Sequence, residues 1–255
     1  MNIRKNRFYD ILPYDYNRVK LNHSKLEKTD YINATYVKND LGQITHIAAQ
    51  GPIGELETLG GRRDTTIRDF WHMIWQENVE CIVMLTLCVE GLRHKCAIYW
   101  PENAEEPIKI DDTLQMTMTC ITEDEICFQR EIKLEKAGQK PRMIMQWHYK
   151  DWLDCTAPEN SELLLSFMQK IRKENYNRPK LVHCSAGVGR TGVYICLDLL
   201  LDALDKSKHI NVFEMVKMLR ETRVNMVQTP EQYATIYETI AMAIRQRQNS
   251  SVANE

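Results

Sequence analysis

The sequence predicts a single mixed α/β domain, and three observations indicate it. Strand-like segments occupy much of the N-terminal two thirds of the chain, while helical periodicity dominates the remaining third. No internal repeat, low-complexity tract or Pro/Gly-rich linker divides the chain. The 255 residues, with an apolar fraction of 44%, suffice for one large core. We therefore expect one domain over residues 1–247 and a frayed polar tail over residues 248–255.

The strands are expected from apolar runs and from alternation of apolar and polar residues. Residues 1–60 are rich in turn residues that separate short strand-like pieces such as residues 31–37. Residues 81–88 are a nearly continuous apolar run, which is typical of a buried central strand. The strand candidates after residue 60 are 81–88, 113–121, 126–134, 143–149 and 180–183.

The helices are expected from apolar residues that recur at helical spacing. In the first candidate, Ile67, Phe70, Trp71, Ile74 and Trp75 share one face. The expected helices cover residues 65–78, 160–174, 190–206, 211–223 and 229–247. The polar, glycine-containing segment 54–64 is expected to be an exposed loop.

The composition excludes several classes of protein. Thirty-three basic and 35 acidic residues give a net charge of −2, which does not favour bulk nucleic-acid binding. No apolar stretch approaches the roughly 18 residues of a membrane span, and the charged start of the chain lacks the apolar run of a signal peptide. The eight cysteines form no Cys-x-x-Cys motif, so we expect mostly free buried thiols, with no metal and no other cofactor.

One segment carries the chemistry of the chain, the run Leu181-Val-His-Cys-Ser-Ala-Gly-Val-Gly-Arg-Thr-Gly192. An apolar strand leads into a glycine-containing loop, and a helix begins near Arg190. Inward-turned backbone N–H groups and a helix N-terminus would bind a tetrahedral oxyanion. Cys184 at the start of this loop would be held as a thiolate, and Arg190 could chelate two anion oxygens. The pattern therefore predicts phosphoryl transfer to sulfur.

The run His183-Cys-Ser-Ala-Gly-Val-Gly-Arg-Thr-Gly192 resembles the signature of the phosphotyrosine-specific protein tyrosine phosphatases, which carry a Cys-x5-Arg motif. The resemblance covers nearly the whole chain and implies one catalytic domain with a highly twisted mixed central sheet flanked by helices. Further segments match the family in the expected order: 5–15, 30–34, 50–52, 69–71, 95–101 and 228–233.

The resemblance implies roles for the residues of the signature. Cys184 would be the nucleophile and Arg190 the phosphate chelator, while the hydroxyl of Thr191 would ease departure of the thiolate in the second step. His183 would help to keep Cys184 ionised. The loop residues that would bind the phosphate are Ser185, Ala186, Gly187, Val188 and Gly189.

The general acid implied by the resemblance is Asp154, in Trp152-Leu-Asp-Cys-Thr-Ala-Pro158. The family pattern there is Trp-Pro-Asp-x-Gly-x-Pro. This chain has Leu153 in place of the first proline and Thr156 in place of the glycine. We expect these departures to shift the balance between open and closed loop, because proline restricts the backbone and glycine tolerates a positive φ.

The remaining site residues lie outside the signature. Gln228 and Gln232 match the glutamines that position the attacking water, and Glu90 matches a glutamate partner of the catalytic arginine. Phe8 stands where the family usually has a tyrosine that stacks on the phosphotyrosine ring. Asp10 matches the aspartate that binds the substrate backbone.

The resemblance implies a metal-independent phosphatase of phosphotyrosine proteins, monomeric and cytoplasmic, or the cytoplasmic catalytic domain of a larger protein. Two alternatives remain at this point. The departures at Phe8, Leu153 and Thr156 are compatible with a domain that binds phosphotyrosine without turnover. The shared Cys-x5-Arg chemistry also allows a phosphatase of phosphoserine, phosphothreonine or phosphoinositides, although a deep aryl slot argues against it.

Overall fold

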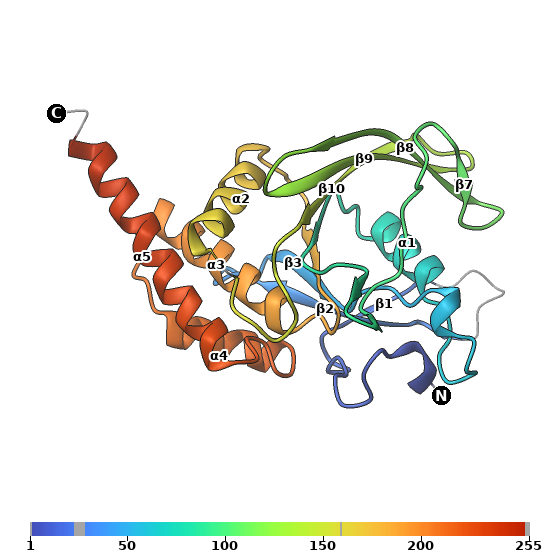
Figure 1. Cartoon of the computed structure of the whole chain (residues 1–255), viewed down its shortest axis with the longest axis horizontal. Coiled ribbons are helices and arrows are strands. Elements are labelled where there is room, and N and C mark those ends of the chain that lie inside the picture. Colours follow the sequence, from blue (N-terminus) through green and yellow to red (C-terminus); the bar gives the residue numbers. More distant parts are fainter. Residues whose placement is uncertain (1, 23–28, 159, 253–255) are drawn as a thin grey trace.

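The computed structural model describes residues 2–22, 29–158 and 160–252, and a strongly twisted nine-stranded sheet forms its centre (Figure 1). The strand order is β1-β2-β3-β11-β4-β10-β9-β8-β7. The four middle strands run parallel to one another: β3 (Ile44–Ala49), β11 (Lys180–His183), β4 (Cys81–Met84) and β10 (Arg142–Tyr149). Loops that follow parallel strands meet at one edge of the sheet, so the loop after β11 lies at its middle.

Antiparallel strands extend the sheet on both sides. They are β1 (Arg18–Lys20) and β2 (Tyr31–Lys38) beside β3, and β9 (Cys127–Lys136), β8 (Leu114–Glu123) and β7 (Ile108–Lys109) beside β10. A separate hairpin of β5 (Val89–Glu90) and β6 (Arg93–His94) follows β4. The hairpin supplies candidate site residues at the edge where β4 and β11 end.

The two faces of the sheet are covered by different helices. The strand β4 shows the division, because Cys81 and Val83 belong to one apolar cluster while Ile82 and Met84 belong to the other. One face carries α1 (Ile67–Gln76). The other carries α2 (Ser161–Lys173), α3 (Gly189–Asp205), α4 (Val212–Thr222) and α5 (Pro230–Val252), which gather on the left of Figure 1. Two short 3₁₀ turns, η1 (Ile3–Lys5) and η2 (Glu55–Glu57), lie in the N-terminal part.

Asparagine caps fix the beginning of two helices. The Oδ1 atom of Asn160 accepts from the N–H of Glu162 at 2.8 Å, and that of Asn211 accepts from the N–H of Glu214 at 3.1 Å. Each cap satisfies an N–H group that has no partner within its helix. The cap at Asn160 sets where α2 begins after the loop that carries Asp154.

The expected mixed α/β fold is confirmed, with three local differences. The apolar run 81–88 is a strand only as far as Met84, because the chain then turns into the β5–β6 hairpin. Helix α5 continues past residue 247 to Val252, so most of the expected tail is helical. The segment 54–64 is only partly exposed, because it contains η2 and buries the side chain of Glu57. No helix among the described residues has an apolar stretch long enough to cross a membrane.

Candidate active site

The loop after β11 forms a tight cradle around the thiol of Cys184. It runs from Cys184 to Val188, and α3 begins at Gly189. The backbone N–H of Gly187 donates to Cys184 Sγ at 3.3 Å. Gly187 has a φ of +74°, and a Cβ there would lie 2.2 Å from the Ala49 carbonyl oxygen, so no other residue fits. Cys184 itself is buried, with 2% of the residue exposed.

Three buried polar atoms of this loop and helix start have no hydrogen-bond partner among the described residues. They are Ser185 Oγ, Arg190 Nε and Thr191 Oγ1. Buried polar groups in proteins are nearly always paired, so an unpaired set beside one thiol marks a place for a polar ligand. A tetrahedral oxyanion has the acceptor oxygens that these donors lack.

A buried arginine holds the cradle from behind. Arg223 donates from Nε to the Gly187 carbonyl at 2.9 Å and from Nη2 to the Ala186 carbonyl at 3.1 Å. It also donates to Asn33 Oδ1 and Thr35 Oγ1 of β2. Complete burial lowers the pKa of Arg223 to about 10. Because these two carbonyls are held away from the cradle, the N–H groups of the loop remain available to an anion.

Arg190 joins the cradle to two other loops. Its Nη1 donates to Glu90 Oε1 at 2.7 Å and to the Trp152 carbonyl at 2.6 Å. Its Nη2 donates to Asp154 Oδ1 at 3.0 Å. The two terminal nitrogens of the guanidinium are therefore held by these partners, while its Nε remains without a partner among the described residues. Glu90 lies where the sequence resemblance places it, as the partner of this arginine.

The loop of residues 152–158 closes over the cradle and brings Asp154 to it. The carboxylate of Asp154 also accepts a hydrogen bond from Lys95 Nζ, and its N–H donates to Glu90 Oε2 at 3.0 Å. Burial raises the pKa of Asp154, but the hydrogen bond from Lys95 and the charge of Arg190 outweigh it, so the pKa lies below its ordinary value. Lys95 was matched only as part of a motif, and its contact with Asp154 could not be read from the sequence.

The structure shows the conformation of the loop at Thr156 and Leu153, the two residues that depart from the family pattern. Cys155, not Thr156, takes the positive φ of +59°, so the conformation of Thr156 does not call on the freedom of a glycine. The hydroxyl of Thr156 instead donates to the Leu153 carbonyl at 2.9 Å and closes the turn. Leu153 itself is 53% exposed.

The two candidate glutamines lie against the first residue of α3. A Cβ on Gly189 would lie 3.0 Å from Gln232 Nε2 and 3.1 Å from Gln228 Oε1, so both amides approach the cradle closely. Gln232 Oε1 accepts from the Gln228 N–H at 2.9 Å, and its Nε2 donates to the Thr156 carbonyl at 3.3 Å. The glutamines are therefore connected to the loop that carries Asp154.

His183 is fully buried behind Cys184. Its Nδ1 lies 3.2 Å from the Cys184 carbonyl oxygen, and its Nε2 lies 2.7 Å from the Tyr99 hydroxyl, which also accepts from Gln146 Nε2. Burial lowers the pKa of His183 to about 3, so the ring is neutral at pH 7. His183 therefore contacts the backbone of Cys184 as a neutral ring.

The two residues expected to contact the substrate beyond the phosphate lie in the N-terminal loop. Phe8 is half-buried and packs against the apolar cluster that contains Cys184. Asp10 is exposed. The loop is fixed to β2, because Asn33 Nδ2 donates to the Ile11 carbonyl at 2.7 Å and to Asn6 Oδ1 at 2.9 Å. Among the described residues, no group of three His, Cys, Asp or Glu side chains could hold a metal ion.

Comparison with known proteins agrees with this geometry. Residues 2–242 match the family model of the protein-tyrosine phosphatases. The rat receptor-type tyrosine-protein phosphatase zeta is 39% identical over 95% of this chain and 10% of its own length. The human receptor-type tyrosine-protein phosphatase C is 37% identical over 94% of this chain and 18% of its own length. The rat tyrosine-protein phosphatase non-receptor type 20 is 35% identical over 92% of this chain and 53% of its own length. The chain thus spans between a tenth and about half of these relatives. It belongs to the protein-tyrosine phosphatase family.

Proposed function

We propose that the chain hydrolyses phosphotyrosine in proteins through a cysteinyl-phosphate intermediate. The observation that carries this proposal is the meeting of a thiol, a ring of unpaired donors and a carboxyl group around Arg190. A phosphate bound in the cradle would accept from the loop N–H groups and from the unpaired Nε of Arg190. These donors would hold it with phosphorus facing Cys184 Sγ.

In the first step, Cys184 Sγ attacks phosphorus and the bond from phosphorus to the phenolic oxygen breaks. Asp154 donates its proton to the departing oxygen. Asp154 is paired with Arg190 and Lys95, which favours the carboxylate. The bound phosphate brings negative charge to the same cations, so the proton affinity of Asp154 rises as the substrate enters.

In the second step, water attacks phosphorus and the bond from phosphorus to sulfur breaks. Asp154 accepts the proton of the water, and the electron pair returns to Cys184 Sγ. Gln228 and Gln232, whose amides lie against Gly189, are placed to orient this water. The unpaired hydroxyl of Thr191 can donate to the departing thiolate.

The substrate class follows from the surroundings of the cradle. Phe8 would form one wall of a slot for an aryl ring, and this favours phosphotyrosine over the shorter phosphoserine. All eight cysteines are free, as the nucleophile must be. Because a reactive thiol persists only under reducing conditions, we propose that the chain works in the cytoplasm.

The test is the rate of phosphate release from a phosphotyrosine peptide by wild type, Cys184→Ser and Asp154→Ala. We expect Cys184→Ser to be inactive and Asp154→Ala to lose roughly 10²–10⁴ in kcat while it still binds the peptide. A wild-type rate no higher than that of Cys184→Ser would show a phosphotyrosine-binding domain without turnover. Equal loss of binding and turnover in Asp154→Ala would assign Asp154 a structural role.

A further inference from the structure

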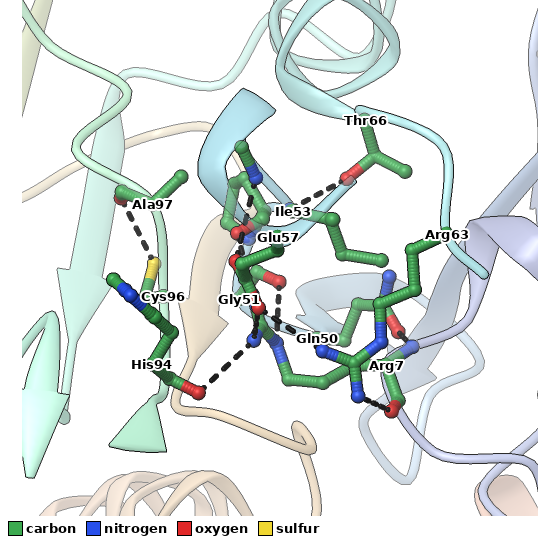
Figure 2. A network of polar contacts seen from close by, with 12 residues as sticks. Arg7, Gln50, Gly51, Ile53, Glu57, Arg63, Thr66, His94, Cys96 and Ala97 are labelled. Carbon is green, nitrogen blue, oxygen red and sulfur yellow. Dashed lines mark hydrogen bonds and ion pairs between the residues drawn. The ribbon is translucent and has the colours of Figure 1, made fainter. Parts of the chain in front are cut away.

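Arg7, the residue before Phe8, is held at every polar group that it has. Figure 2 shows the guanidinium enclosed by partners from three segments of the chain, and the residue is only 4% exposed. Both of its terminal nitrogens contact the carboxylate of Glu57, with Nη2 at 2.8 Å from Oε1. The Glu57 side chain is itself 4% exposed. This is a bidentate ion pair away from water, in the segment 54–64.

The same guanidinium ties together two backbone segments that border the candidate active site. Nη2 donates to the Pro52 carbonyl at 2.7 Å and Nε donates to the Gly51 carbonyl at 3.3 Å. The N–H of Gly51 in turn donates to the Ser185 carbonyl in the cradle at 3.0 Å. Nη1 lies 3.4 Å from the carbonyl of His94, which precedes Lys95.

The backbone of Arg7 is held as firmly as its side chain. Its N–H donates to Gln50 Oε1 at 2.9 Å, and its carbonyl accepts from Arg63 Nη2 at 2.8 Å. Arg63 also donates from Nη1 to Glu57 Oε2 at 3.2 Å (Figure 2). The carbonyl that Arg63 holds belongs to the peptide group that connects Arg7 to Phe8. The direction in which Phe8 leaves the backbone is therefore set partly by the segment 54–64.

Apart from this network and Gly54, which is buried against Ala97, the segment 54–64 is largely exposed. Its large apolar side chains point to solvent, with Leu56 at 70% and Leu59 at 82% exposure. Its other contact with the N-terminal loop is at Asp64, whose N–H donates to the Arg4 carbonyl at 2.9 Å and whose carboxylate pairs with the Arg4 side chain. Its buried and paired groups thus converge on the loop that carries Phe8.

We propose that the segment 54–64 is a positioning element for substrate recognition, in which Glu57 and Arg63 fix Arg7 and thereby the aryl-binding wall at Phe8. The inference rests on the proposed function, because it assigns the segment a role in binding the phosphotyrosine ring. Glu57 and Arg63 touch neither the phosphate nor the reacting atoms. Their loss should therefore weaken recognition of the ring and leave the cradle intact.

The deciding variant is Arg63→Ala, since Arg63 lies at the surface end of the network and its loss leaves the Arg7–Glu57 pair in place. We expect KM for a phosphotyrosine peptide to rise about three- to tenfold, with kcat within about twofold of wild type. Inhibition by inorganic vanadate, which needs only the cradle, should be unchanged. The matched control is Arg62→Ala, a neighbouring exposed arginine, which should keep the wild-type KM.

A second variant, Glu57→Gln, removes the charge that faces Arg7 and should raise KM more than Arg63→Ala does. If it fails to fold, Arg63→Ala decides alone. An unchanged peptide KM in Arg63→Ala, or a parallel loss of kcat and vanadate affinity, would overturn the inference. Peptide binding is also measured in the Cys184→Ser background. No binding by this parent would contradict the proposed function, whereas equal binding by the parent and by its Arg63→Ala derivative would contradict only the role of the segment.

Discussion

At the scale of single residues, the eight cysteines differ sharply in their surroundings. Burial raises the pKa of Cys88 and Cys127 to about 11, and it raises the pKa of Cys81, Cys96 and Cys196 further. Among the eight, Cys184 alone accepts a hydrogen bond from a loop N–H, and it lies in the cradle that Arg190 joins. The same chemical group therefore packs in or against the apolar core at five positions and lies in the cradle at one, where we propose that it is the nucleophile.

This contrast predicts the order of modification. With limiting iodoacetamide at pH 6, we expect Cys184 to be alkylated first, and mass spectrometry of the digested chain measures the order. The exposed Cys120 and Cys155 are the internal references, because they have better access to the reagent and lack the loop N–H groups. Labelling of either reference before Cys184 would contradict the proposed stabilisation of the thiolate.

Arg223 gives a second prediction at this scale. Lysine carries the same charge but cannot reach the carbonyls of Ala186 and Gly187 together with Asn33. We expect Arg223→Lys to weaken vanadate binding by about 10- to 100-fold, because the loop carbonyls are no longer held away from the anion. A cooperative thermal unfolding transition of the Arg223→Lys variant would establish that the variant is folded. Unchanged vanadate affinity in a folded Arg223→Lys variant would mean that the loop keeps its shape without this residue.

The sequence pointed to the candidate site residues that stand in recognisable motifs and missed those whose role depends on tertiary packing. Cys184 to Arg190 could be interpreted together, because a strand, a loop and a helix start follow one another in one short run. Arg223 stands in no recognised motif, and its role depends on the packing of α4 against β2. The same holds for the contact between Lys95 and Asp154, since it exists only when two separate loops meet.

At the scale of secondary-structure elements, periodicity predicted the helices well and the sheet only in part. Helix α1 was expected at 65–78 and lies at 67–76, because its apolar face is uninterrupted. The strand order could not be predicted, since β11 lies between β3 and β4 although more than 90 residues separate it from either along the chain. Pairing between such distant strands leaves no local signal in the sequence.

The loop of residues 152–158 carries the prediction at this scale. The Thr156 hydroxyl closes the turn onto the Leu153 carbonyl, so it favours the conformation that brings Asp154 to Arg190. We expect Thr156→Val, which removes the hydroxyl and keeps the shape, to lower kcat about two- to tenfold with little change in vanadate affinity. Thr156→Ser keeps the hydroxyl and is the matched control. If Val and Ser behave alike, the turn does not depend on this hydrogen bond.

At the scale of the whole molecule, burial around the candidate active site keeps two histidine rings neutral. His183 and His148 are both buried, at 0% and 5% exposure. Burial lowers the pKa of His183 to about 3, and burial together with Arg130 lowers that of His148 to about 4. Both rings serve as neutral hydrogen-bonding groups, His183 behind Cys184 and His148 against the Thr86 carbonyl. The fold is therefore sensitive to acid at these positions, as it is at the buried His46, whose pKa burial also lowers.

The direction of this sensitivity follows from proton binding. In the unfolded chain a histidine has a pKa of about 6.5, so between pH 6.5 and 4.5 the unfolded chain binds protons that the folded chain does not. Stability is therefore complete above about pH 7 and falls as the pH drops through 6.5, at up to about 1.4 kcal/mol per pH unit for each ring. Carboxylates whose pKa values are lowered, such as those of Asp111 and Asp198, lose their contribution only near pH 4 and below, where their unfolded forms take up protons.

We therefore expect His148 and His183 together to lower the free energy of urea unfolding by about 4 kcal/mol between pH 7 and pH 5, about half from each, with the buried His46 adding to this loss. The variant His148→Gln keeps an amide donor for the Thr86 carbonyl but has no group at this position that titrates in this range. Its free energy of unfolding should therefore fall by about 2 kcal/mol less than that of wild type between the two pH values. The same substitution at the exposed His209 is the matched control and should retain the full loss. If His148→Gln were as acid-sensitive as wild type, the neutral state of His148 would not contribute to this pH dependence, and the acid sensitivity of the fold would arise elsewhere in its core.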